Sequence, residues 1–172
     1  MTSQLKVDRI SPATGSEIII DGLGGGVSNI HMSSKNSDTP LVEGVWTRVI
    51  HDVNFIGNPN FNSSTGVYTV GTGEAGLYFA NFNCNVWGTT GTSVSLSGIY
   101  VNDAIRLKGN TSNSDGYGLG IACPSTGILD LNDGDEVTIY AQGTYRTGTQ
   151  SVKDEAGLHT ATWTMFKIGG AS

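Results

Sequence analysis

Charged side chains are scarce in this chain of 172 residues. They make up 14% of the sequence, whereas ordinary globular domains contain roughly 25%. The nine lysines and arginines are scattered along the chain, and the formal net charge is -6. Binding to phosphate backbones or to anionic lipid surfaces needs clustered basic side chains. We therefore expect no nucleic-acid partner and no anionic membrane partner.

Long apolar runs and cysteines are scarce too. No run approaches the roughly 18 apolar residues of a membrane-spanning helix, so we expect no membrane insertion. The first ten residues, MTSQLKVDRI, lack the apolar centre of a secretion signal. Two cysteines, Cys84 and Cys123, are too few for a disulfide scaffold. Cys84 alternates with Phe82 and Val86, which favours a buried thiol; a bridge to Cys123 is the alternative.

The motifs of common enzyme classes are missing. The sequence contains no Gly-x-Ser-x-Gly, no His-Glu-x-x-His and no phosphate loop ending in Gly-Lys-Ser or Gly-Lys-Thr. The glycine run at residues 22–26 lacks the spacing of a dinucleotide-binding turn. A polysaccharide depolymerase, the remaining enzymatic alternative, would need paired carboxylates facing a groove. The histidines stand apart from one another and from the cysteines (His31, His51 and His159). We expect no enzymatic activity and no cofactor.

Four acidic residues lie close together in the last third of the chain: Asp130, Asp133, Asp135 and Glu136. A calcium loop of the helix-loop-helix type needs a glutamate at its twelfth position, and this group lacks one. Residues 132–135, with the sequence Asn-Asp-Gly-Asp, are typical of a tight turn. We expect a solvated hairpin turn here, and a calcium site is the alternative.

Alternating patterns typical of β-strands are abundant. Between Thr65 and Phe82 a Thr-Gly turn leads into a short strand, a small-residue corner at residues 71–76 and a long aromatic strand. In the long strand, apolar residues at 78, 80, 82, 84 and 86 share one face, and asparagines at 81, 83 and 85 share the other. No segment shows convincing helical periodicity. These parts predict an all-β fold, an antiparallel β-sandwich.

Further strands are predicted on both sides of this region. Alternate residues from Val45 to Phe55 form one face of the first strand, and others cover residues 93–101, 128–131, 137–141 and 160–168. The last predicted strand carries large apolar groups on both faces, with Trp163 and Met165 on one and Phe166 on the other. A second apolar face is typical of a strand that contacts another subunit.

The N-terminal quarter is predicted to be separate from the sandwich. Two strand-like pieces, LKVDRI and SEIIIDG, flank the turn sequence Ser-Pro-Ala-Thr-Gly. A lone hairpin is marginal in water, so we expect it to dock on another component. Residues 22–40 are rich in glycine, serine and asparagine, which predicts an extended arm. We therefore expect an anchor and arm over residues 1–40 and a head over residues 41–172, with anchor contacts from Leu5, Val7, Ile10, Ile18 and Ile20.

The aromatic strand and its surroundings resemble the globular head of the complement first component's q subunit, in the tumour-necrosis-factor-like superfamily. The family's turn falls on Thr65 and Gly66, its short-strand aromatic on Tyr68, and its long strand opens with Gly-Leu-Tyr-Phe at residues 76–79. Residues 129–137 match its Leu-x-Leu and Gly-Asp pattern, and residues 162–166 its closing strand, with Met165 in place of a glycine. The resemblance covers residues 45–168. It implies a jelly roll of about ten strands that assembles as a homotrimer.

The opening LKVDRISPATGSEIII is similar to the start of many phage tail-fibre and virion proteins. Together the two resemblances predict a trimeric virion structural protein, assembled in the host cytoplasm. It would attach by its N-terminal arm to other virion proteins of the capsid, collar or tail, and project its head for shell reinforcement or host-surface binding. A free carbohydrate-binding lectin or adhesin of the same fold is the alternative.

A ligand surface is predicted in the loop at residues 109–120. Glycine, serine and asparagine around one tyrosine give adaptable hydrogen bonding beside a rigid ring that can stack on a sugar. The expected ligand is a glycan of the host surface, and the alternative is a tolerant connecting loop. The candidate contact residues are Asn110, Ser112, Asn113, Asp115 and Tyr117.

Overall fold

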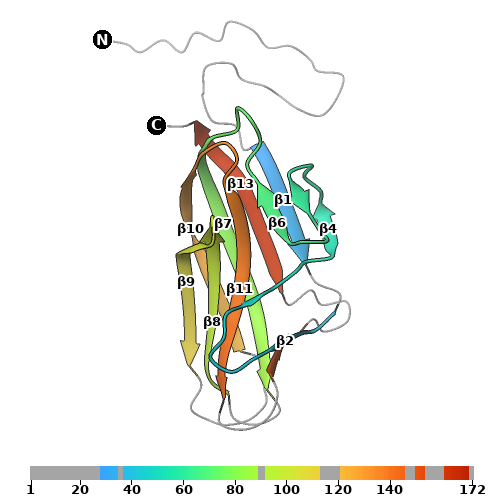
Figure 1. Ribbon diagram of the computed structural model, residues 1–172, viewed down its shortest axis with the longest axis vertical. Helices are drawn as coiled ribbons and strands as arrows, with labels where there is room; N and C mark the ends of the chain where they lie inside the picture. Colours follow the sequence, from blue (N-terminus) through green and yellow to red (C-terminus); the bar gives the residue numbers. More distant parts are fainter. Residues whose placement is uncertain are drawn as a thin grey trace, which may run out of the picture.

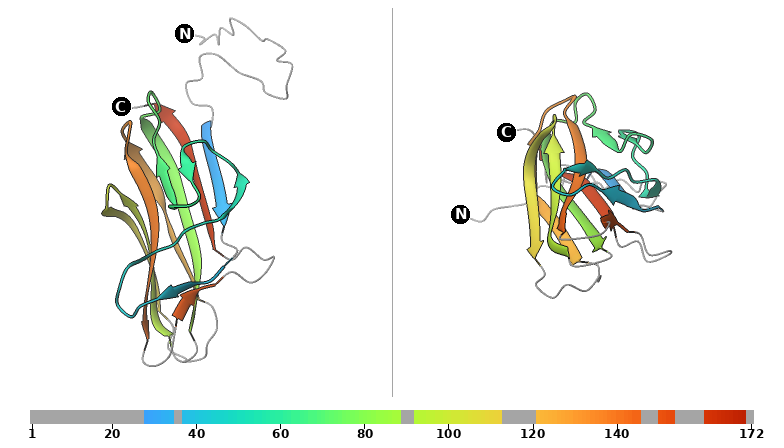
Figure 2. Two further views of the ribbon diagram at one scale, coloured as in Figure 1. Left: turned by 45° about the vertical axis from the view of Figure 1, so that its right-hand side comes forward. Right: turned by 60° about the horizontal axis from the view of Figure 1, so that its bottom comes forward.

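The computed structural model describes residues 28–34, 37–88, 92–112, 121–145, 150–153 and 161–170. This part of the chain forms two antiparallel β-sheets that lie face to face (Figures 1 and 2), which confirms the predicted all-β sandwich. Sheet A has the order β2-β12-β7-β13-β1-β4, with β10 also paired to β7. Sheet B has the order β5-β6-β11-β8-β9, with β3 paired to β11. The described residues contain no helix long and apolar enough to cross a membrane.

The strands differ widely in length. Several consist of only two or three residues, which is why the structure has more strands than the ten or so that were expected. Their bounds are β1 Ser28–Ser34, β2 Thr39–Leu41, β3 Thr47–Arg48, β4 Val53–Ile56, β5 Phe61–Asn62, β6 Val67–Thr69, β7 Gly76–Gly88, β8 Thr92–Val101, β9 Ala104–Ser112, β10 Ile121–Leu131, β11 Glu136–Tyr145, β12 Gln150–Val152 and β13 Thr162–Gly170.

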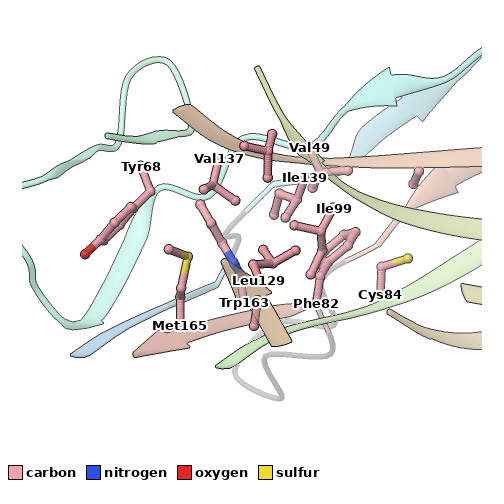
Figure 3. Packing of buried hydrophobic residues seen from close by; sticks show 14 of the residues in the cluster. Val49, Tyr68, Phe82, Cys84, Ile99, Leu129, Val137, Ile139, Trp163 and Met165 are labelled. Carbon is pink, nitrogen blue, oxygen red and sulfur yellow. The ribbon is translucent and has the colours of Figure 1, made fainter. Parts of the chain in front are cut away.

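Strand β7 lies at the centre of sheet A, and its side chains alternate between the inside and the outside as predicted. Its residues 78, 80, 82, 84 and 86 are fully buried, and its asparagines face outward. Figure 3 shows Phe82 and Trp163 from sheet A pointing toward Ile99 and Ile139 from sheet B. The core is therefore the layer between the two sheets, which is the arrangement expected for strands with one apolar face.

The sandwich begins earlier than predicted. Residues 28–34 form β1, which lies between β13 and β4 in sheet A, so the boundary at residue 41 is wrong and the arm cannot extend to residue 40. The residues of β1 that are described as buried are polar: His31, Ser33 and Ser34. Because hydrophobic alternation is the main signal for a strand, a strand that buries histidine and serine escapes it.

The single strand predicted from Val45 to Phe55 is also wrong. The chain forms β3 in sheet B and then β4 in sheet A, so it crosses from one sheet to the other. Val49 is buried and donates its N–H to the carbonyl of Ile139 at 2.9 Å, whereas Val45 is 50% and Phe55 43% exposed. Alternating residues on a crossing segment therefore do not share one face.

The turn at residues 132–135 does not join a hairpin, which corrects a further prediction. It links β10 in sheet A to β11 in sheet B, and the two strands do not pair with each other. The local turn is as expected, since Asp135 donates its N–H to the carbonyl of Asn132 at 3.1 Å and Gly134 has φ 84°. Turn residues determine the local bend, but they do not determine whether the flanking strands pair.

The two cysteines lie side by side and are unbridged. Cys84 and Cys123 are register partners on β7 and β10, and both are buried free thiols. The Cys123 thiol donates to the carbonyl of Ser95 at 3.1 Å. Burial raises the pKa of the Cys84 thiol well above its ordinary value, and the neighbouring Cys123 adds to the rise. The thiol form of Cys84 is therefore the stable one in the fold.

We expect both thiols to be unreactive in the folded protein. A thiol reagent such as dithionitrobenzoate at pH 8 should label neither within an hour, because it needs an accessible thiolate. After unfolding in denaturant without reductant, two thiols per chain should react. Rapid labelling of the folded protein, or the absence of both thiols after unfolding, would contradict the structure.

Sheets A and B approach each other closely where their edge strands β9 and β10 lie against each other. A Cβ atom added to Gly109 would overlap the carbonyl oxygen of Pro124 and lie 2.6 Å from its carbonyl carbon. A Cβ on Gly127 would lie 2.6 Å from a methyl carbon of Leu107. Glycine is therefore required at position 109, where the obstacle is backbone and cannot rotate away.

Replacement of Gly109 by alanine is expected to lower the free energy of unfolding by about 1–3 kcal/mol, because the strands must separate to admit the methyl group. Urea unfolding followed by circular dichroism measures the change. Gly57→Ala is the matched control, since a Cβ there meets nothing within 4 Å. Equal stability of the two variants would argue against the close approach of β9 and β10.

Candidate functional site

The outward face of sheet A, called here the A face, carries a row of large apolar side chains. Phe79 on β7 is the register partner of both Phe166 on β13 and Ile128 on β10, so the three stand side by side across the sheet. The two phenyl rings stack with centroids 5.0 Å apart and an interplanar angle of 27°. Ile128 is 59% exposed. The row is thus an apolar strip open to solvent.

Two further rows of the A face are polar but uncharged. Asn81 pairs in register with Thr164 and with Thr126, whose hydroxyl donates to the Asn81 side-chain oxygen at 2.6 Å. Asn83 pairs with Thr162 and Pro124 in the next row. The nine side chains of the three rows include no charged group. An aromatic strip flanked by uncharged polar groups has the composition of an interface core.

The sequence identified one part of this face. The prediction that the last strand has two apolar faces is confirmed: Trp163 and Met165 are buried, while Phe166 is half-buried on the outside. The sequence did not place Phe79 and Ile128 beside Phe166, because register between distant strands leaves no local pattern. Phe79 lies two residues before Asn81, so it shares the face of the β7 asparagines. This position was the signal that it faces outward.

The acidic residues of the 132–135 turn organise the neighbouring loop. The Asp133 carboxylate accepts hydrogen bonds from the backbone N–H groups of Gly73 at 2.7 Å, Glu74 at 3.1 Å and Ala75 at 2.8 Å. These hydrogen bonds, led by that from Gly73, lower the pKa of Asp133. Among the described residues, no three histidine, cysteine, aspartate or glutamate side chains are grouped to hold a metal ion. The carboxylate of Asp133 is thus occupied in positioning residues 73–75.

A cleft of about 430 Å³ opens beside this turn, between β9 and β10. Its lining combines Arg106, Asp130 and Asp135 with the apolar side chains of Leu107 and Ile128. Such a cleft accommodates a small polar molecule, and mixed charges give it no single preference for an anion or a cation. Ile128 connects the cleft to the edge of the A face.

Three buried polar residues, two from β1 and one from the segment before β4, form a hydrogen-bonded chain in the core. The Ser33 hydroxyl lies 3.0 Å from Nε2 of His31 and 3.0 Å from Nδ1 of His51. The His31 ring packs on Phe61 with centroids 4.1 Å apart, and its Nδ1 has no hydrogen-bond partner among the described residues. Burial lowers the pKa of His31 from 6.5 to about 4. The fold therefore requires this histidine to be neutral.

Acid is expected to destabilise the fold before the carboxylates titrate. Because the pKa of His31 is about 4 when folded and 6.5 when unfolded, its stabilising effect is complete above pH 6.5 and is lost as the pH falls toward 4. The free energy of unfolding should fall by about 2 kcal/mol between pH 7.5 and pH 5. Urea titrations at several pH values measure this slope, and His31→Phe should flatten it. An equal slope in that variant would assign the effect to other groups.

The residues predicted to bind ligand are described only in part. Asn110 lies on β9 with its side chain exposed, and Ser112 is the last residue of that strand. Asn113, Asp115 and Tyr117 lie outside the described residues, and so do all five anchor residues, Leu5, Val7, Ile10, Ile18 and Ile20. The ligand loop and the anchor therefore remain predictions.

No protein-family model matches this chain, and no curated protein matches it either. Three solved structures resemble it in fold. Murine APRIL at pH 5.0 has a TM-score of 0.58 at 12% identity, over 81% of this chain and 98% of its own. The globular domain of zebrafish complement 1qA protein has a TM-score of 0.57 at 14% identity, over 81% of this chain and 96% of its own. Eiger TNF from S. frugiperda has a TM-score of 0.59 at 14% identity, over 87% of this chain and 96% of its own. The chain thus has the jelly-roll fold of the complement q subunit and tumour-necrosis-factor-like proteins, as its sequence predicted.

Proposed function

We propose that the chain is a non-catalytic structural protein of a phage-type virion and that it forms a homotrimer through the A face. The observation that carries the proposal is the group of three uncharged rows on the A face, with its apolar strip of Phe166, Phe79 and Ile128. A solvent-exposed apolar strip costs free energy in water and marks an interaction surface on a soluble protein. Assembly through this face would remove the strip from water.

A closed ring of three is the arrangement that the fold favours. The family that the sequence resembles assembles as trimers, and a closed ring gives every subunit the same contacts without leaving an open end. Ile128 lies on β10, which pairs only with β7 among the described strands, so it stands near an edge of sheet A. In such a ring, both Ile128 at the edge and the rest of the A face can contact neighbouring subunits.

The virion assignment rests on the N-terminal segment. Its opening is similar to the start of phage tail-fibre and virion proteins, and its apolar residues would dock on a capsid, collar or tail component. Because the sandwich begins at β1, we now limit the proposed anchor and arm to residues 1–27. Three heads on one particle site would bind a host surface with the avidity of three copies.

Deletion of residues 1–26 tests the attachment. In particles assembled in a host that expresses the truncated chain, we expect the protein to be missing from purified virions. The truncated chain should still show the β-sheet circular dichroism and the solution mass of a trimer. Incorporation of the truncated chain into virions would contradict the anchor.

A free carbohydrate-binding lectin is the second candidate. It is favoured by a group of half-buried aromatic rings on the outward face of sheet B, around Tyr100 and Tyr140. In a free lectin the N-terminal segment would be part of the fold. Failure of the chain lacking residues 1–26 to fold would therefore support the lectin.

A further inference from the structure

Three aromatic side chains from distant parts of the sequence meet on the outward face of sheet B. Trp46 precedes β3, Tyr100 lies on β8 and Tyr140 on β11. The ring centroids of Trp46 and Tyr100 are 5.9 Å apart in an edge-to-face arrangement, and those of Tyr100 and Tyr140 are 4.4 Å apart. None of the three side chains is buried in the core. Together they form a continuous group of rings, called here the B-face cluster.

Two basic side chains lie over this cluster. The Arg48 guanidinium is 5.6 Å from the Tyr140 ring centre, and its Nε donates to the Tyr140 hydroxyl at 3.2 Å. The Lys108 ammonium is 5.9 Å from the Trp46 ring centre. Attraction between each cation and a ring face holds both cations against the aromatic group. Two cations thus lie at one aromatic group, in a chain whose net charge is -6.

A glycine in the strand beneath lets the rings come together. A Cβ on Gly98 would lie 3.0 Å from Cε2 of Tyr100 and 3.2 Å from Cζ3 of Trp46. A larger side chain at this position would have to displace these rings or the side chain of Ile105, whose Cδ1 would lie 3.2 Å away. Gly98 is the register partner of Tyr140 on one side and of Lys108 on the other. The ring arrangement therefore depends on the absence of a side chain at the centre of the sheet.

We propose that the B-face cluster binds a glycan that carries carboxylate groups. Sugar rings present C–H groups on their flat faces, and these stack on the electron-rich faces of aromatic rings. The hydroxyls of Tyr100 and Tyr140 offer hydrogen bonds beside the stacking surface. Arg48 and Lys108 match the carboxylates of uronic or sialic acids by charge.

One residue of the predicted ligand surface belongs to the same region. Asn110 lies two residues beyond Lys108 on β9, so it is on the same outward face. The exposed side chain of Asn110 adds an amide to the polar groups around the rings. The inference deepens the proposed function, because it names a ligand class and a site for the head. The site itself needs neither the trimer nor the particle.

Glycan binding by the full-length protein can be tested on an array of oligosaccharides, each carboxylated member paired with a neutral one. We expect binding to carboxylated members and at least a tenfold loss in Trp46→Ala and in Tyr140→Ala. Gly98→Val should also lose binding, because it separates the rings. Trp87→Ala is the matched control, since Lys153 lies over that ring at 5.5 Å but Trp87 is outside the cluster. Circular dichroism verifies that each variant is folded.

A separate measurement tests the role of Arg48 and Lys108. The double variant Arg48→Gln, Lys108→Gln should lose the preference for carboxylated over neutral sugars. The proposal is overturned if the native protein binds no member of the array, or if Trp87→Ala weakens binding as much as Trp46→Ala. It is also overturned if single-stranded oligothymidylate binds the cluster and the sugars do not. A monomeric mass with intact sugar binding would reject only the proposed trimer.

Discussion

Aspartate in place of Ile128 is expected to convert the protein from a trimer into monomers. The substitution puts a carboxylate at the end of the apolar strip beside Phe79, where the trimer would bury it without a partner. An unpaired buried charge costs on the order of 2–5 kcal/mol in an interface, and each trimer would contain three of them. Light scattering coupled to size exclusion at about ten micromolar chain should then give the mass of one chain.

The matched control for this prediction is Ile105→Asp. Ile105 is 41% exposed, and it lies beside the rings on the outward face of sheet B. The same change of chemistry on that side of the sandwich should leave the trimer mass unaltered. Because both isoleucines are exposed in the single chain, neither variant should lose its β-sheet circular dichroism. Dissociation by both substitutions, or by neither, would place the interface elsewhere.

Alanine in place of Trp163 is expected to lower the free energy of unfolding by about 3–5 kcal/mol. Trp163 is the largest fully buried side chain, and it projects inward from β13. Its ring centroid lies 5.2 Å from that of His31 and 5.4 Å from that of Phe61, both in edge-to-face arrangements. Removal of the ring leaves a cavity that the surrounding strands cannot fill. Urea unfolding monitored by circular dichroism measures the loss.

Trp163→Phe separates the ring packing from the indole N–H. The Nε1 of Trp163 is buried without a hydrogen-bond partner among the described residues. Phenylalanine keeps an aromatic ring and removes this unsatisfied donor, so it should cost less than half as much as alanine. A phenylalanine variant as unstable as the alanine variant would show that ring packing is not the main contribution.

The two predictions concern opposite faces of sheet A. Trp163 lies on the inward side of β13 and stabilises the fold, whereas Phe166 lies on its outward side beside Phe79. A change at Ile128 should alter the mass and leave the intrinsic stability of the chain nearly unaltered. A change at Trp163 should destabilise the chain itself. This difference arises because successive side chains of a β-strand point to opposite faces of the sheet.

The sandwich and its long central strand could be predicted from the sequence because their signal is local. In β7, five alternate residues are apolar and asparagines occupy the opposite face. Only one orientation of the strand puts the apolar face inside. The outward position of Phe166 followed from the same reasoning. The resemblance to the complement q subunit head then supplied the jelly-roll topology, which alternation alone cannot distinguish from other sandwiches.

The errors arose where the signal is not local. Strand β1 buries His31 and Ser33, so it lacks apolar alternation. The turn at residues 132–135 was identified as a turn, but the partners of the strands on either side depend on the whole sandwich. The B-face cluster was missed for the same reason. Tyr100 and Tyr140 each alternate with buried residues, yet only strand pairing places their rings together.

The solution mass of the purified full-length chain tests the central claim most directly. Light scattering coupled to size exclusion should give three times the chain mass of 18.0 kDa, unchanged on dilution into the low micromolar range. That result would be expected if the A face is buried between three copies. A mass of a single chain at all concentrations would contradict the trimer, leave the A face without its proposed partner and favour the free lectin.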